Sequence, residues 1–279
     1  MAVFLMILGA VFLDVSDQAG SAARREDLCT VAASPKPIRD LPEGSGVAVS
    51  RLTPGLLWSH NDSGRPALIG LDGSGAVKAR VAVTGARVVD WEDVAAGPCA
   101  QGSCLYIADI GDNNRVRQRV TIYRVPEPTP GETRTRPAEA IDAVYPDGPR
   151  DAEALVVAGP DELFIISKAP ARETALYRLK GPLREGTPSR LERVAGLPLA
   201  AVTGAALSPD GADVAIRTND RVVFYAAREL FAGKTAGGRP FDLRPLREPQ
   251  GEGVAMGNGG VVYLVGEGGT LASLTCALR

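Results

Sequence analysis

The segment Glu92-Asp93-Val94-Ala95, followed by the apolar run CLYIADIGDN at residues 104–113, is one copy of a phrase that occurs five times in the 279-residue chain. Each copy has an acidic or glycine-rich lead-in, a small apolar step and a strand that ends in polar residues. The other strands read LLWSHND (56–62), ELFIISK (162–168), DVAIRTN (213–219) and VVYLVGEG (261–268). Taking Val47, Val94, Leu155, Ala206 and Val254 as equivalent gives spacings of 47, 61, 51 and 48 residues. Repeats of this length built from short strands predict a β-propeller or a similar array.

The number of copies predicts an all-β fold, a single propeller with five blades. Only 25 residues follow Val254, too few for a whole blade, so we expect the stretch before Val47 to complete the last blade. Strands from both termini would then close the ring. A sixth blade is the alternative, and it would have to lie in degenerate sequence between residues 115 and 150. The segment PEPTPGETRTRPAEA (126–140) is expected to be a surface excursion, because proline cannot donate to a central ladder.

The charge balance limits the classes of partner. The chain carries 31 basic and 33 acidic residues with no basic block, so it lacks the sustained positive field that nucleic-acid binding requires. We therefore expect no nucleic-acid partner, and we expect a monomer.

The N-terminus has the pattern of an export signal. The first 13 residues, MAVFLMILGAVFL, are apolar and uncharged, too short to span a bilayer and of the length of a secretory apolar core, although no basic residue precedes them. We predict that residues 1–25 are a signal peptide or N-terminal apolar segment, that residues 26–279 form the propeller, and that the protein is secreted without a stable membrane span. A buried N-terminal strand and an uncleaved membrane tether are the alternatives.

Four cysteines bear on the compartment. Cys99 and Cys104 flank a short loop, while Cys29 and Cys276 lie at the two ends of the mature region. If ring closure brings the ends together, the pairs Cys29–Cys276 and Cys99–Cys104 are the sensible choice among three connectivities. Free buried thiols are the alternative, and a zinc site is disfavoured because no C-x₂-C spacing occurs.

The strand pattern also predicts where a site would lie. In an antiparallel hairpin the beginning of one strand lies beside the end of the next, so the lead-in acids and the polar strand ends share one mouth of the central channel. The residues expected at this mouth include His60, Asp62, Asp90, Glu92, Asp93, Asp109, Asp112, Asp151, Glu153, Lys168, Thr203, Arg217, Gln250, Glu252 and Glu267.

So many carboxylates around one opening would repel one another unless they are protonated, paired or neutralised by a cation. Ca²⁺ accepts six to eight oxygen ligands and suits a set poor in histidine and thiolate. We predict a Ca²⁺ site, with ligands drawn from Asp62, Glu92, Asp93, Asp109, Asp112 and Glu252. The alternative for each acid is structural: Asp and Asn favour turns, and a recurring acid can accept hydrogen bonds from backbone N–H groups of the next blade.

The candidate catalytic residues are His60, Glu153, Lys168 and Arg217. His60 is the only histidine, so any histidine-based mechanism must use it; a satisfied structural histidine is the alternative. Lys168 and Arg217 end strands where other copies carry acids, and each could hold an anionic group or simply balance charge. The chain contains no G-x-S-x-G elbow, P-loop or HExxH motif.

The strings WSHNDSG (58–64), DWEDVA (90–95), YPDGPRDAEAL (145–155) and QGEGVA (250–255) resemble those of a group of secreted, largely uncharacterised bacterial β-propeller proteins. The likeness covers roughly residues 45 to 268. The chain is more distantly similar to phytase-like esterases and to calcium-dependent lactonases related to regucalcin. That resemblance implies a metal-centred or acid-lined mouth that hydrolyses a lactone or a phosphoester.

Two hypotheses follow. In the first, the chain is an exported Ca²⁺-dependent hydrolase of a small anionic or ester substrate, in which the ion polarises a substrate oxygen and activates water. Lys168 and Arg217 would orient an anionic group, and His60 or a spare carboxylate would move the proton. In the second, the chain is a non-catalytic propeller that binds a ligand or a protein, and its acids are structural or hold a structural ion.

Overall fold

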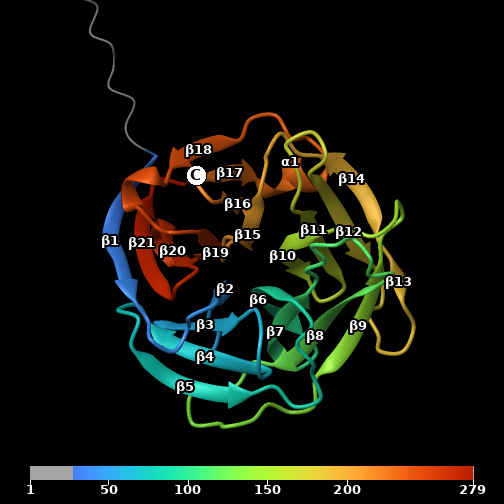
Figure 1. Ribbon diagram of the computed structural model, residues 1–279, viewed down its shortest axis with the longest axis horizontal. Helices are drawn as coiled ribbons and strands as arrows, with labels where there is room; N and C mark the ends of the chain where they lie inside the picture. The colour runs from blue at the N-terminus through green and yellow to red at the C-terminus, as the bar shows by residue number, and fades with distance from the viewer. Residues whose placement is uncertain (1–27, 279) are drawn as a thin grey trace, which may run out of the picture.

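Five sheets surround a central axis (Figure 1) in the computed structural model, which describes residues 28–278. Blade 1 contains β2 (Gly44–Val49), β3 (Leu56–Asn61), β4 (Ala67–Asp72) and β5 (Val77–Ala82). Blade 2 contains β6 (Trp91–Cys99), β7 (Gly102–Asp109), β8 (Val120–Pro126) and β9 (Glu139–Val144). Blade 3 contains β10 (Ala152–Gly159), β11 (Glu162–Ser167), β12 (Ala175–Lys180) and β14 (Glu192–Gly196).

Blade 4 contains β15 (Val202–Leu207), β16 (Asp213–Thr218), β17 (Arg221–Ala226) and β18 (Arg239–Asp242). Blade 5 contains β19 (Gly251–Met256), β20 (Val261–Gly266), β21 (Thr270–Cys276) and, as its outer strand, β1 (Cys29–Pro37). Short β13 (Ser189–Arg190) joins the edge of blade 2 in parallel with β9. The helical pieces are α1 (Ala227–Phe231), η1 (Arg244–Leu246) and η2 (Asn258–Gly260). The prediction of a five-bladed propeller is confirmed, and no sheet between residues 115 and 150 forms a sixth blade.

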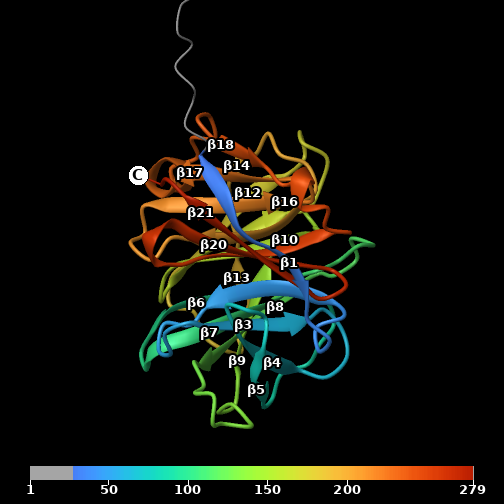
Figure 2. The same cartoon turned by 90° about the vertical axis from the view of Figure 1, so that its left-hand side faces the viewer.

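The ring is closed as predicted, by strands from both ends of the described chain. β1 lies beside β21 (Figure 2) and pairs with it in antiparallel direction. Cys29 is opposite Cys276, and these two cysteines form a disulfide. The second disulfide, Cys99–Cys104, joins β6 to β7. Two disulfides are typical of proteins that fold in an oxidising, extracytoplasmic compartment. The predicted signal segment at residues 1–25 lies outside the described residues.

Every innermost strand carries a β-bulge near its beginning. Ladder partners jump from Trp91↔Asp109 to Asp93↔Ala108 in β6, which leaves Glu92 as the extra residue. The same one-residue insertion occurs in β2, β10, β15 and β19. A bulge re-aims the side chain of the extra residue. The bulges therefore define five equivalent positions at one mouth of the channel.

The bulges also correct the alignment of the fourth copy by one residue. Gly204, directly after the bulge, pairs with Arg217 as Ala154 pairs with Ile166, so Ala205 rather than Ala206 is equivalent to Leu155. The spacing of the repeats was predicted correctly, but a run of glycine and alanine residues does not define the register of a strand from the sequence alone.

The core lies between the blades. Apolar side chains of neighbouring sheets pack face to face, and Trp58 and Trp91 are fully buried between blades 1 and 2. The proline-rich segment lies beside the outer strand of blade 1, where Thr135 exchanges backbone and side-chain hydrogen bonds with Ala82 and Thr84. It therefore ties blade 2 to blade 1 without entering a central ladder. Among residues 28–278, no helix is long and apolar enough to cross a membrane.

Candidate functional site

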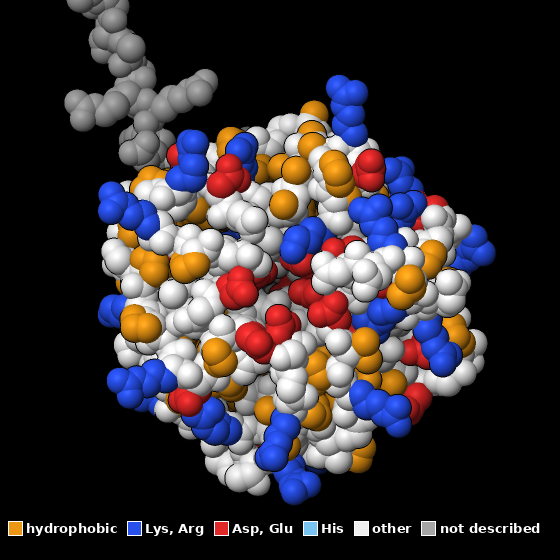
Figure 3. All heavy atoms as spheres, in the orientation of Figure 1, with side chains coloured by type: hydrophobic (Ala, Val, Ile, Leu, Met, Phe, Trp, Pro, Cys, Tyr) orange, Lys and Arg blue, Asp and Glu red, His pale blue; other side chains and the backbone are white. Residues whose placement is uncertain are grey.

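The acid mouth is the opening at which the five innermost strands begin. Asp and Glu side chains gather there around the centre of the face, over a depression on the propeller axis (Figure 3). The five bulge positions carry Ser45, Glu92, Glu153, Thr203 and Glu252. Ser45 Oγ donates to the Glu92 carbonyl at 2.6 Å, and Thr203 Oγ1 donates to the Glu252 carbonyl at 3.0 Å. The hydroxyl residues of blades 1 and 4 thus join neighbouring blades, while blades 2, 3 and 5 supply carboxyls.

A second tier of polar residues lies two positions before the bulges of four blades, at Glu43, Asp90, Asp151 and Gln250. Asp90 packs against Glu92 across Gly111: a Cβ on Gly111 would meet Glu92 Oε1 at 2.2 Å and Asp90 Oδ2 at 2.4 Å. Only a glycine leaves space for these two carboxyls. This role of Gly111 could not be predicted from the sequence, because nothing in a linear pattern shows that two side chains from β6 and its lead-in lie against it.

Lys168 is the basic side chain that reaches into the cluster. It donates to Glu153 Oε1, and Glu153 is only 4% exposed. The other carboxylate oxygen of Glu153 is buried and has no hydrogen-bond partner within the described part of the chain. Glu153 therefore has one oxygen held by a cation and one free to accept a proton.

Burial and mutual repulsion raise the pKa of the carboxyls in this cluster. Desolvation raises the pKa of Glu92 most, and the charges of Glu153, Asp90 and Asp151 raise it further. Desolvation also raises the pKa of Glu153, and Lys168 offsets only part of that rise. The pKa of Lys168 is itself raised by Glu153 against its own desolvation, so Lys168 stays cationic. Of the two, Glu153 ionises more easily because Lys168 lies against it, whereas Glu92 retains its proton at neutral pH.

Glu252 and Asp62 belong to the same mouth. Burial raises the pKa of Glu252, which accepts a hydrogen bond from the Gln250 amide. Burial and the neighbouring Glu43 raise the pKa of Asp62 to about 6. The structure thus brings together four of the predicted residues, Glu92, Glu153, Lys168 and Glu252, with Asp62 on the rim near Asp90.

Asp93 has a different position from its neighbour Glu92. It is fully buried, and its carboxylate accepts hydrogen bonds from the backbone N–H groups of Val94 (2.8 Å) and, in blades 3 and 4, of Leu155 (2.8 Å) and Ala205 (3.4 Å). The equivalent positions in the other blades are Gly46, Ala154, Gly204 and Gly253. Asp93 therefore fills the axis and joins three blades, which is the structural alternative foreseen for these acids.

Asp109 and Asp112 also hold their own surroundings. Asp109 accepts from the N–H groups of Val89 and Asp90 and pairs with Arg117 at 2.8 Å. Asp112 accepts from the N–H groups of Val116 and Arg117, at 2.9 and 2.8 Å. These two predicted metal ligands are used for loop and strand-end hydrogen bonds rather than facing the Glu cluster.

Arg217 and His60 are buried and make their contacts within the protein. Arg217 is fully buried, packs over Gly251, pairs with Glu248 at 2.5 Å and donates to the carbonyl oxygens of Gly253 and Val265. His60 is fully buried in edge contact with Trp91, and desolvation lowers its pKa to about 4. Both positions are at the strand ends that the sequence predicted, but the side chains point into the protein, so the geometry gives them structural roles.

A calcium ion needs six to eight oxygen ligands that converge on one point. Within residues 28–278, no group of three or more His, Cys, Asp or Glu side chains converges as a metal ion requires. Lys168 already neutralises Glu153, and Asp93, Asp109 and Asp112 are bound to backbone N–H groups. The described side chains therefore form no ready-made set of carboxylate ligands, and the Ca²⁺ site stays a prediction.

No protein-family model matches the chain, and no curated protein sequence matches it. Solved structures do. An aldose sugar dehydrogenase from Streptomyces coelicolor, in its PQQ-bound form, is similar with a TM-score of 0.51 and 12% identity over 88% of this chain and 99% of that one. The soluble aldose sugar dehydrogenase from Escherichia coli gives 0.51 and 13% over 90% and 100%.

A gluconolactonase from Xanthomonas campestris aligns over 90% of this chain and 96% of its own, with 12% identity and a TM-score of 0.49. At 12–13% identity, the two dehydrogenase likenesses concern the fold alone. The comparisons therefore show that the chain has the fold of a β-propeller.

Proposed function

We propose that the chain is an exported hydrolase that opens an uncharged ester, of the lactone class, at the acid mouth. One observation carries the proposal: equivalent bulges in blades 2, 3 and 5 place Glu92, Glu153 and Glu252 in one buried cluster with Lys168. Carboxyls crowded in this way cost stability, because burial and repulsion both disfavour their ionised forms. Perturbed carboxyls in a concave site are typical of acid–base catalysis. The two disulfides support export.

The proposed chemistry uses one carboxyl as an acid and another as a base. Glu153, ionised beside Lys168, takes a proton from water as the water oxygen attacks the ester carbonyl carbon. Glu92 then gives its proton to the ring oxygen as the carbon–oxygen bond breaks, and the product is a hydroxy acid. Proton exchange with solvent restores both carboxyls. Lys168 favours the ionised form of Glu153 and orients its carboxylate.

The charge of the mouth favours an uncharged ester over a phosphoester. Lys168 is paired with Glu153, Arg217 is buried against Glu248, and Arg117 is paired with Asp109. No unpaired cation therefore faces the cluster within the described residues. A dianionic substrate would meet the carboxylates of Asp90, Asp151 and Glu252 without compensation.

The test is a substrate panel of five- and six-membered lactones and aryl phosphates, with Glu153→Gln and Glu92→Gln. Each variant should lower kcat/KM for the lactone at least about 100-fold, because removal of a general acid or base typically costs 10²–10⁴-fold. Glu192→Gln, an exposed glutamate of β14 without an ion pair among the described residues, is the matched control. Lactone hydrolysis that survives both substitutions would contradict the proposal.

Calcium binding stays a prediction, and no catalytic step is given to it. Titration of the protein with Ca²⁺ by calorimetry, before and after treatment with a chelator, tests it directly. Stoichiometric binding that Glu92→Gln abolishes would support the Ca²⁺-dependent form of the hypothesis. Unchanged lactone hydrolysis after chelation would support the metal-free mechanism.

A non-catalytic propeller is the second candidate. It is supported by Asp93, Asp109 and Asp112, whose carboxylates accept hydrogen bonds from backbone N–H groups. It predicts that Glu92→Gln and Glu153→Gln leave the chain folded while no ester or phosphoester of the panel is turned over.

A further inference from the structure

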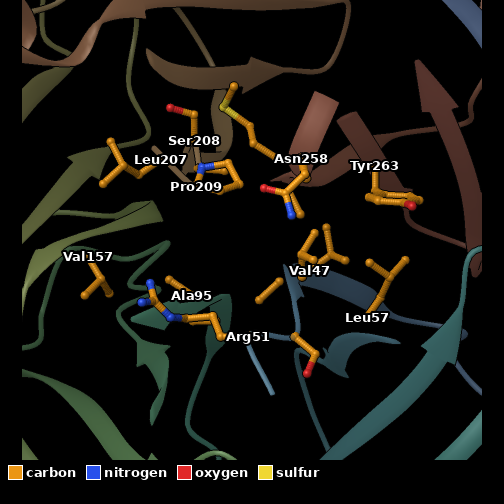
Figure 4. Close-up of a pocket in the computed structure, with 18 of the residues that line it drawn as sticks. Val47, Arg51, Leu57, Ala95, Val157, Leu207, Ser208, Pro209, Asn258 and Tyr263 are labelled. Carbon is orange, nitrogen blue, oxygen red and sulfur yellow. The ribbon is translucent and has the colours of Figure 1, made fainter. Parts of the chain in front are cut away.

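A second cavity opens at the other end of the channel. It has a volume of about 710 Å³ and lies where the innermost strands end (Figure 4). Its lining comes from all five blades and includes none of the carboxyls of the acid mouth. This volume is within the range of roughly 300–1,000 Å³ found for small-molecule sites. Asp93, which accepts hydrogen bonds from blades 3 and 4, directly precedes the lining residue Val94.

The space arises from small side chains at one repeated position. The residue after the equivalents Val47, Val94, Ala205 and Val254 is alanine in each case: Ala48, Ala95, Ala206 and Ala255. Further along the strands the wall consists of larger apolar side chains, including Leu57, Val157, Met256 and Tyr263. Such a wall favours an apolar ligand body, because removing apolar surface from water is favourable.

Arg51 is the one basic residue in this lining. Its backbone N–H is held by the Glu127 carboxylate at 3.1 Å, which fixes the loop after β2. Among residues 28–278 its guanidinium forms no ion pair, and in Figure 4 it extends toward the side of Val157. The acid on the opposite rim, Asp210, is already bound by Ser208 Oγ at 2.6 Å and the Ala212 N–H at 3.0 Å.

We infer that this cavity binds a small organic carboxylate with an apolar body, such as a medium-chain fatty acid. The apolar part lies against the alanine and valine wall, and the carboxylate accepts hydrogen bonds from the Arg51 guanidinium, which matches its planar geometry. The inference goes beyond the hydrolase proposal and does not depend on it, since the two sites share no residue.

Calorimetric titration with octanoate, compared with uncharged octanamide, tests the inference. Octanoate should bind wild type with one-to-one stoichiometry, and Arg51→Gln should weaken it about tenfold or more, which corresponds to loss of a hydrogen bond between charged groups. Octanamide should bind wild type and Arg51→Gln equally weakly. Arg136→Gln, an exposed arginine in the proline-rich segment, is the matched control and should bind octanoate as wild type does.

Pocket filling provides the second arm. Ala158→Phe places a ring in the cavity from blade 3 and should abolish octanoate binding while the circular dichroism spectrum is retained. The inference is overturned if octanoate and octanamide bind equally, or if Arg51→Gln binds octanoate as well as wild type. It is also overturned if sedimentation shows a dimer that Arg51→Gln dissociates, because the occupant would then be a second copy of the chain.

Discussion

The two mouths of the channel are built from the two ends of the same five strands, yet they have opposite chemistry. At the beginning of the strands, bulges bring Glu92, Glu153 and Glu252 together, and four of the blades add a second polar tier. At the end of the strands there is no such bulge pattern, and alanines surround an apolar cavity with one arginine. Asp93 lies between them. The difference teaches that one repeated scaffold can present two chemically unlike mouths, because each position of the repeat varies independently.

Replacing Asp93, which lies between the two mouths, should have the largest effect on stability. Asp93→Asn turns one carboxylate oxygen into an NH₂ group that faces backbone N–H donors of neighbouring blades. We expect a loss of about 3 kcal/mol in the free energy of unfolding, since buried donors lose their acceptor. Urea unfolding measures it. Full stability of the variant would show that Asp93 does not join the blades.

Glu92→Gln should raise the free energy of unfolding, whereas Asp93→Asn lowers it, because Glu92 belongs to the crowded cluster and has no structural role. The raised pKa values of Glu92, Glu153, Glu252 and Asp90 mean that the folded state binds protons more tightly than the unfolded chain. Stability due to these groups is therefore present below the ordinary carboxyl pKa and is lost as pH rises through the raised values. The neutral amide should make the protein about 1–2 kcal/mol more stable at pH 8.

Thermal unfolding between pH 4 and 9 measures how the stability of the protein changes with pH. His60 acts in the other direction: its pKa is lowered to about 4, so stability due to it is lost as pH falls from its ordinary pKa toward that value. With several raised carboxyls and one such histidine, we expect maximum stability near about pH 5. A wild-type curve that rises from pH 5 to 8 would contradict the protonated cluster.

Gly111→Ala tests the acid mouth without changing a charge. The added methyl would displace the Asp90 and Glu92 carboxyls, which lie where its Cβ must go. We expect lactone hydrolysis to fall about tenfold with octanoate binding unchanged, because misplacing an acid by a fraction of an ångström weakens proton transfer. Gly131→Ala, at an exposed glycine with open space around it, is the control. Equal effects on both mouths would mean that they are coupled.

Ser45→Ala and Thr203→Val should have the smallest effects. Each removes one hydrogen bond between neighbouring blades, at bulge positions that lack a carboxyl. We expect each to lower the free energy of unfolding by about 1 kcal/mol and to leave hydrolysis unchanged. Loss of activity in either variant would show that the hydroxyl residues belong to the reacting group.

The sequence predicted the fold better than the site. Five copies of one phrase determined the blade number, and the short last copy determined how the ring closes, because both follow from strand counting. The mouth was also placed correctly. The directions of the side chains were not predicted. Glu92 and Asp93 are adjacent and equally acidic, and only the bulge, a three-dimensional feature, turns Glu92 toward the cluster and Asp93 into the axis. Arg217 likewise ends a strand as predicted, but Gly251 leaves room for it to turn inward.

The Cys29–Cys276 disulfide closes the chain into a covalent circle, because it joins two residues that are 247 positions apart in the sequence. A protease that cuts once in an exposed loop, such as the proline-rich segment, would therefore release nothing. The nicked chain would keep its mass on a non-reducing gel and separate into two pieces only after reduction. A single cut therefore leaves the two pieces in one molecule as long as the disulfide is intact, and new chain ends could be engineered into any such loop.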